Sequence, residues 1–122
     1  MGTSNELGAK GEAAAVEYLS GEGHEILCRN YRQGKAEIDI ISKEGPVIVF
    51  SEVKLRSYAS FGEPEEFVVL KKKRLMKQAA EAYMHENFPD AEMRFDIVAV
   101  VRRNGTLTVR HLKDAFFQLD NE

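Results

Sequence analysis

The sequence predicts an α/β fold in which helices flank a mixed central β-sheet, with the element order α-β-β-β-α-β-β. Two long segments repeat apolar residues near the helical period, and five segments rich in β-branched and aromatic residues read as strands. Turn signals separate the strands, and Asn104-Gly105 is the strongest of them. We expect one domain over residues 1–122, because a chain of 122 residues suits a single core.

The two helices are predicted over residues 5–19, ahead of Gly21, and over residues 69–88, where Pro89 ends the pattern. The turn signal Lys-Glu-Gly-Pro divides the second and third strands. In chain order, the other segments are strands over 24–32, 36–42 and 47–56, a loop over 57–67, strands over 92–103 and 106–112, and a C-terminal tail or short helix over about 113–122.

Composition excludes several classes of protein. A net charge of −3 argues against a protein that coats nucleic acid through bulk charge, although a local basic patch remains open. The single cysteine, Cys28, cannot form an internal disulfide, and the three scattered histidines offer neither a zinc spacing nor a good catalytic base. Without a signal-peptide core or an apolar run of about 18 residues, we expect a cytoplasmic protein with no membrane contact.

The hairpin formed by the second and third strands carries charges where a core strand would be apolar. A two-residue turn at Gly45-Pro46 places Asp39 opposite Glu52 and Glu37 opposite Lys54. Because side chains alternate along a strand, these four charges share one face of the sheet. The opposite face is expected to carry the apolar residues Ile38, Ile40, Val49 and Val53.

Facing carboxylates destabilise a hairpin unless another group compensates them. Lys54 and Arg56 can supply part of that compensation, and a divalent cation between Asp39 and Glu52 can supply the rest, because carboxylate oxygens suit Mg²⁺. Such a site activates water for attack on a phosphate, which Lys54 would contact. The alternative is a solvated face with cross-strand salt bridges. Apolar residues on both faces favour a central position, where unpaired charge is costly.

Asp39, followed after twelve residues by Glu52-Val53-Lys54, resembles the PD-(D/E)XK nuclease signature. Four segments in order, "GAKGEAAAVEYL", "RNYRQGKAEIDII", "VFSEVKLRSYASFGEP" and "RFDIVAV", resemble the YraN-like family. These are small bacterial proteins of the restriction-endonuclease-like fold, related to archaeal Holliday-junction resolvases. The resemblance covers roughly residues 7–101 and implies that fold for this chain.

The resemblance also implies roles for individual residues. Glu12 would join Asp39 and Glu52 in holding Mg²⁺ or Mn²⁺, with Lys54 completing the catalytic set; without the resemblance, Glu12 reads as an exposed helix acid. Glu37 belongs to the family's Gly-Glu-Ile-Asp pattern, in which Ala36 here replaces the glycine. Two supporting residues, Gln78 and Tyr83, resemble a Gln and a Tyr that related nucleases place near the site, with a spacing one residue longer.

Five cations are candidates for contacts with nucleic-acid phosphates: Arg56, Lys71, Lys72, Lys73 and Arg74. The alternative for the last four is that they form the solvated start of a helix.

We therefore expect a magnesium-dependent or manganese-dependent nuclease that hydrolyses phosphodiester bonds in DNA, including branched DNA. The alternatives are an inactive nucleic-acid-binding module of the same fold and a structural domain that acts through a protein partner. A homodimer is expected if the enzyme cuts a junction symmetrically. Replacing Asp39 or Glu52 by Ala should abolish cleavage and leave the fold intact or more stable, since each change removes one of two facing like charges.

Overall fold

The computed structural model describes residues 3–57 and 70–115, so most of the predicted loop and of the predicted C-terminal tail lie outside the described residues. Its elements, in chain order, are α1 (Thr3–Gly21), β1 (Glu25–Gln33), β2 (Ala36–Glu44), β3 (Val47–Ser57), α2 (Leu70–Asn87), β4 (Glu92–Arg103) and β5 (Thr106–Leu112). The predicted fold class and element order are confirmed, and the bounds differ from the predicted ones by two residues or fewer.

The strands form one mixed sheet in the order β1-β2-β3-β4-β5. Neighbouring strands are antiparallel except β3 and β4, which are parallel and are connected through α2. This follows from loop lengths: short turns join antiparallel strands, whereas a parallel pair needs a long crossover. β3 lies at the centre of the sheet, which is where the charged segment containing Glu52 falls.

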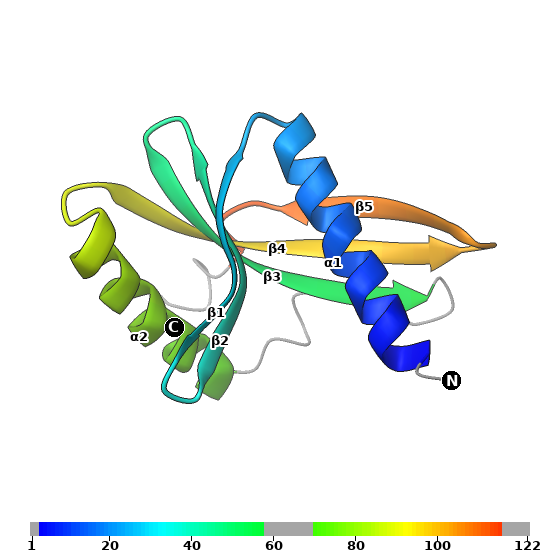
Figure 1. Ribbon diagram of the computed structural model, residues 1–122, viewed down its shortest axis with the longest axis horizontal. Helices are drawn as coiled ribbons and strands as arrows, with labels where there is room; N and C mark the ends of the chain where they lie inside the picture. The colour runs from blue at the N-terminus through cyan, green and yellow to red at the C-terminus, as the bar shows by residue number, and fades with distance from the viewer. Residues whose placement is uncertain (1–2, 58–69, 116–122) are drawn as a thin grey trace.

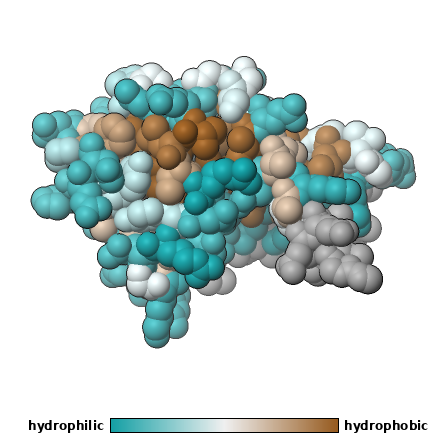
Figure 2. All heavy atoms as spheres, in the orientation of Figure 1, coloured by the Kyte–Doolittle hydropathy of each residue, from teal (hydrophilic) through white to brown (hydrophobic). Residues whose placement is uncertain are grey.

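The helices cover opposite faces of the sheet (Figure 1). α1 packs on β3, β4 and β5 through a cluster that contains Leu19, Val98 and Val100, whereas α2 packs on β1 and β2 through Met76 and Ala80. From this viewpoint, hydrophobic residues gather in a band across the upper part of the molecule, with hydrophilic residues below it (Figure 2). Among the described residues, no helix is long and apolar enough to cross a membrane.

The predicted register of the β2–β3 hairpin is confirmed next to the turn, but the predicted pairs Asp39–Glu52 and Glu37–Lys54 are not formed. Glu44 pairs with Val47 across the two-residue turn, where Gly45 has a φ of 57°. Pairing continues as far as Ile40 and Ser51, after which β2 stays paired with β1 but no longer with β3. The two strands therefore separate at the step where Asp39 and Glu52 follow.

The predicted division of apolar residues between the faces is wrong at Ile38. Ile38 packs on the α2 side with Ile41, whereas Ile40 and Val53 pack on the α1 side. The reason lies on β1, where Asn30 has a left-handed φ of 56° and interrupts the alternation of both strands. Asp39 lies at this crossover, so its side chain is not confined to one face.

A buried polar cluster lies on the α1 side of the sheet and corrects the expectation that the histidines are scattered. The rings of His24 and His111 have centroids 6.0 Å apart. The Nδ1 atom of His24 lies 2.8 Å from Ser42 Oγ, and the Nε2 atom of His111 lies 2.7 Å from Asp96 Oδ2. Because these groups are buried, the cluster ties elements together and offers no open catalytic base.

Asp96 is the centre of this cluster. Its carboxylate accepts two hydrogen bonds from Arg94, at 2.8 and 2.9 Å, which form an ion pair near the start of β4. It also accepts a hydrogen bond from the backbone N–H of Asp114, so the described beginning of the tail turns back onto the sheet. Burial alone would raise the pKa of Asp96, but these hydrogen bonds lower it to about 2.

Candidate active site

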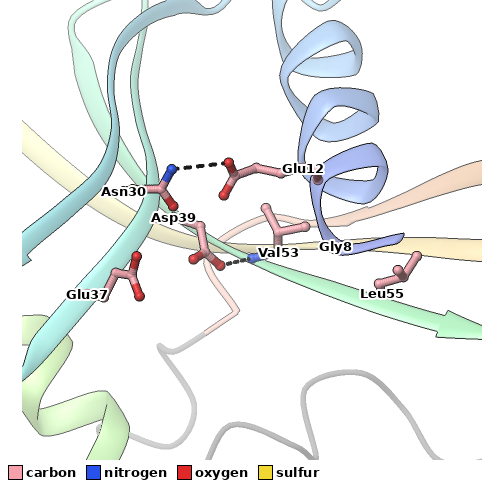
Figure 3. Close-up of a pocket in the computed structure, with 8 residues that line it drawn as sticks. Gly8, Glu12, Asn30, Glu37, Asp39, Val53 and Leu55 are labelled. Carbon is pink, nitrogen blue, oxygen red and sulfur yellow. Dashed lines mark hydrogen bonds between the residues drawn. The ribbon is translucent and has the colours of Figure 1, made fainter. Parts of the chain in front are cut away.

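Asp39 occupies the point where β2 and β3 separate. Its Oδ2 atom accepts a hydrogen bond of 2.8 Å from the backbone N–H of Val53 (Figure 3). The side chain thus satisfies a donor that strand pairing no longer reaches. The bond also fixes the Asp39 carboxylate beside β3, because its donor, Val53, directly follows Glu52 in the chain.

Glu52 is buried and is held by two lysines. Its side chain is 5% exposed, and its Oε2 atom lies 3.2 Å from the Nζ of Lys54 and 2.5 Å from the Nζ of Lys72. Lys54 comes from the same strand, whereas Lys72 comes from the first turns of α2, twenty residues along the chain. Burial alone would lower the pKa of Lys72, but the hydrogen bond and charge of Glu52 outweigh it and raise that pKa.

Among the described residues, no cation lies at hydrogen-bond distance of Asp39 in the way that the two lysines approach Glu52. Burial, and then the negative charge of Glu52, raises the pKa of Asp39 to about 7, and the charge of Glu12 adds to the rise. The Val53 hydrogen bond and the charge of Lys72 oppose the rise without cancelling it. The four charges balance in number, but both lysines pair with Glu52, so Asp39 is the carboxylate whose ionised form is disfavoured.

Glu12 reaches the same region from α1. α1 packs closely on β3 at this point, because a Cβ atom at Gly11 would lie 3.4 Å from the side chain of Leu55, in ordinary van der Waals contact. The Oε1 atom of Glu12 accepts hydrogen bonds from Arg29, at 2.8 Å, and from Asn30, at 3.3 Å. Glu12 thus lies near Asp39 but is paired with β1 in this structure.

Two pockets meet at the acidic residues. The first, about 500 Å³, lies between α1 and the sheet and is lined by Gly8, Ala9, Glu12, Asn30, Glu37, Asp39, Val53 and Leu55 (Figure 3). The second, about 280 Å³, lies on the α2 side and is lined by Lys35, Ala36, Glu37, Asp39, Glu52, Lys72, Leu75 and Met76. Glu37 and Asp39 line both pockets, so the acids are reachable from the two faces of the sheet.

The other predicted site residues lie elsewhere. Lys71 and Arg74 are exposed, Lys73 is buried, and Arg56 donates a hydrogen bond to the backbone carbonyl of Leu55. Gln78 is exposed and lines neither acidic pocket. The ring of Tyr83 packs edge-on against Tyr31 and Phe50 in the α2-side core.

Sequence reasoning missed the part played by three residues. It grouped Lys72 with its neighbours as a phosphate contact, because a run of cations does not show which one the helix turns inward. It gave Arg29 and Asn30 no role, although both hold Glu12. The only local signal was a pair of polar residues in the middle of a strand.

The carboxylates suit a hydrated divalent cation better than a metal enclosed by protein. Within residues 3–57 and 70–115, no three His, Cys, Asp or Glu side chains are grouped so as to hold a metal ion. Mg²⁺, however, commonly takes one or two carboxylates and keeps several waters. Asp39 and Glu52 provide that number, and Glu12 could supply a third oxygen donor if it left Arg29.

Comparison with known proteins agrees with the motifs. Residues 11–100 match the family described as "Uncharacterised protein family UPF0102", to which the YraN-like proteins belong. The chain is 45% identical over 117 residues to a UPF0102 protein of Christiangramia forsetii, with 96% of this chain and 98% of the relative covered. It is 44% identical to one from Bacteroides thetaiotaomicron, with coverage of 96% and 97%. By its motifs, its fold and these near full-length matches, the chain belongs to the UPF0102 family.

Proposed function

We propose that this protein is a metal-dependent nuclease that hydrolyses phosphodiester bonds in DNA. One observation carries the proposal: Asp39 and Glu52 come together with Lys54 and Lys72 where two strands separate and two pockets meet. A plain structural ion pair would bring a cation to each carboxylate, whereas here both lysines pair with Glu52 and the ionised form of Asp39 is disfavoured. The PD-(D/E)XK-like spacing of Asp39, Glu52 and Lys54 supports the same reading.

In this proposal the residues divide the chemistry between them. Asp39 and Glu52 would hold Mg²⁺ or Mn²⁺, and a bound cation supplies Lewis acidity for water activation and for the charge that develops at the phosphate. Lys54 and Lys72 now neutralise Glu52. The ammonium groups of Lys54 and Lys72 would be donors for the scissile phosphate, which needs such donors as its charge grows.

A second candidate is a DNA-binding module of the same fold without turnover. The observation that favours it is that two of the three acids already have partners: Glu52 is paired with lysines and Glu12 with Arg29. Such a site is neutral enough to be stable without a cation. The two candidates differ in whether a divalent cation displaces these pairs.

The test is a calorimetric titration with Mn²⁺, followed by incubation of the same preparation with labelled branched and single-stranded DNA. Asp39→Asn is compared with wild type, and Asp90→Asn, at an exposed position, serves as the control. We expect wild type and Asp90→Asn to bind Mn²⁺ and cleave DNA, and Asp39→Asn to do neither.

Binding of DNA without metal binding or cleavage would instead support the module without turnover. If wild type binds neither Mn²⁺ nor DNA, both candidates fail and the acidic site is structural.

A further inference from the structure

On the α2 side of the sheet, the face continues past the acidic residues and changes from apolar to basic. On β3, Phe50 lies in the α2-side core, Glu52 follows, and the next residues on that face are Lys54 and Arg56. Pairing of β3 with β4 and of β4 with β5 is uninterrupted here, so side chains on the three strands align in rows across this face.

The rows contain cations and hydroxyl groups. Lys54 pairs with Ala99, which pairs with Arg110, so one row leads from the acidic site to the edge strand. The next two rows are Arg56–Val101–Thr108 and Arg103–Thr106. We call the residues Arg56, Arg103, Thr106, Thr108 and Arg110 the basic face.

The outer part of the basic face is a shallow groove. It encloses about 480 Å³ and is lined by Val101, Arg103, Asn104, Thr106, Thr108 and Arg110, without an acidic residue. Arg103, Thr106, Thr108 and Arg110 are all exposed. The alternating residues of these strands, Val98, Val100, Leu107 and Val109, pack toward α1 instead.

Charged residues on an edge strand often serve only to prevent strands of two molecules from pairing. That role requires no particular sign of charge and no continuity with another site. Here every charged member is an arginine, and the row through Lys54 connects the groove with Glu52. These two features fit a ligand that is anionic along its length and passes through the acidic site.

We propose that the basic face binds the sugar-phosphate backbone of a DNA strand as it leaves the acidic site; this rests on the proposed function. From the strand spacing, β3 and β5 are about 10 Å apart, and the rows of Arg110 and Arg103 are about 13 Å apart. DNA carries one phosphate per roughly 3.4 Å of axis on each strand, and the backbone path between phosphates is longer than this rise, so the face follows at most three or four phosphates. Guanidinium groups and threonine hydroxyls are common phosphate donors.

The experiment measures binding of a short fluorescein-labelled DNA duplex by anisotropy, in EDTA, over a range of salt concentrations. The test variant is Arg103→Ala/Arg110→Ala. Its matched control is Arg102→Ala, because Arg102 is exposed on the same strand but alternates to the opposite face. We expect the double variant to bind about tenfold more weakly at moderate salt, with a salt slope smaller by about two.

The conservative variant Arg103→Lys/Arg110→Lys should retain most of the affinity, and urea midpoints equal to wild type should show that all variants fold. An unchanged salt slope in the alanine double variant, an equal loss in Arg102→Ala, or no DNA binding by wild type would overturn the inference.

Cleavage assays with Mn²⁺ distinguish the two proposals. If the alanine double variant loses DNA binding but wild type cleaves no DNA, the nuclease proposal fails and the basic face stands. If wild type cleaves DNA and the alanine double variant binds and cleaves equally well, the basic face fails and the nuclease proposal stands.

Discussion

At the scale of single residues, Asp39 and Glu52 are not equivalent, although the predicted register placed them opposite each other as a matched pair of acids. Glu52 is buried against two lysines, whereas Asp39 has a backbone N–H as its hydrogen-bond partner. A carboxylate with a raised pKa is destabilising when ionised, and one with close cations is stabilising. We therefore restrict the prediction that a change to Ala leaves the fold intact or more stable to Asp39.

Asp39→Asn should stabilise the metal-free protein at high pH. The pKa of Asp39 is raised to about 7, so wild type carries an unfavourable charge above pH 7 that is relieved as the pH falls toward the unfolded pKa of about 4. Asn can still accept the Val53 hydrogen bond. We expect the variant to be more stable than wild type by about 2 kcal/mol at pH 8, with little difference at pH 4.5.

Urea unfolding in EDTA at the two pH values measures this difference, with Asp90→Asn as the exposed control. An equal difference between Asp39→Asn and wild type at both pH values would contradict the assigned pKa.

Glu52→Gln should have the opposite effect on stability. The change removes the carboxylate from Lys54, whose side chain is only 13% exposed, and from Lys72. We expect a loss of about 1–2 kcal/mol at pH 7, because a largely buried ammonium is left without its close partner. The same change removes a charge that raises the pKa of Asp39, so the Asp39 titration should move to lower pH.

Urea unfolding and a carboxyl NMR titration check the two parts of the Glu52 prediction. A stabilised Glu52→Gln would mean that repulsion from Asp39 outweighs both lysine pairs.

At the scale of elements, the polar cluster around Asp96 connects segments that are far apart in the sequence. It joins His24, the residue before β1, to β2 through Ser42, and it joins β4 to β5 through Asp96 and His111. Burial lowers the pKa of His24, so this side chain is neutral at pH 7 and favours the fold above its unfolded pKa of about 6.5. As the pH falls below that value, its contribution is lost.

Asp96→Asn should be strongly destabilising. The side chain is fully buried and accepts hydrogen bonds from Arg94, His111 and the Asp114 backbone, so removing its charge leaves buried donors poorly paired. We expect a loss of about 3 kcal/mol at pH 7. Because the pKa is lowered to about 2, the wild-type advantage should persist above pH 4 and fade as the pH falls toward 2.

The check is urea unfolding of wild type, Asp96→Asn and the exposed control Asp90→Asn at pH 7 and pH 3. A loss below 1 kcal/mol at pH 7 would show that the cluster is not a main support of the sheet.

At the scale of the whole molecule, the site depends on the assembly of parts from across the chain. α1 brings Glu12, the hairpin brings Asp39 and Glu52, and α2 brings Lys72. A ligand that binds these groups together stabilises the folded state as a whole, because the unfolded chain does not hold them in place.

Mn²⁺ should therefore stabilise wild type against urea. At a concentration one hundred times its dissociation constant, the gain is about 2.7 kcal/mol. Asp39→Asn should gain nothing, because it lacks the carboxylate whose ionised form a divalent cation would favour. Unfolding curves with and without Mn²⁺ measure the gain in stability. Mg²⁺ is tested as a second divalent ligand, and K⁺ controls for the effect of ionic strength. Equal stabilisation of the variant would place the cation elsewhere.

Several features of the fold could be predicted because their causes are local. The two-residue turn fixed the register from Glu44–Val47 to Ile40–Ser51. The same reasoning failed at Ile38, because the left-handed backbone of Asn30 breaks the alternation from a neighbouring strand. Similarly, the run of cations at the start of α2 was visible, but its local pattern could not show that Lys72 would reach Glu52 or that Lys73 would be buried.

By itself, the sequence determined the element order, the mixed sheet, the register of the central hairpin and the family. Each of these follows from periodicity, turn residues or motifs, which act over a few neighbouring positions. Only the tertiary structure decided that Asp39 bridges separating strands, that Glu52 is paired with two lysines, and that His24 and His111 share a buried cluster. These features join side chains from distant segments, and their energies depend on burial and on distances that no local pattern contains.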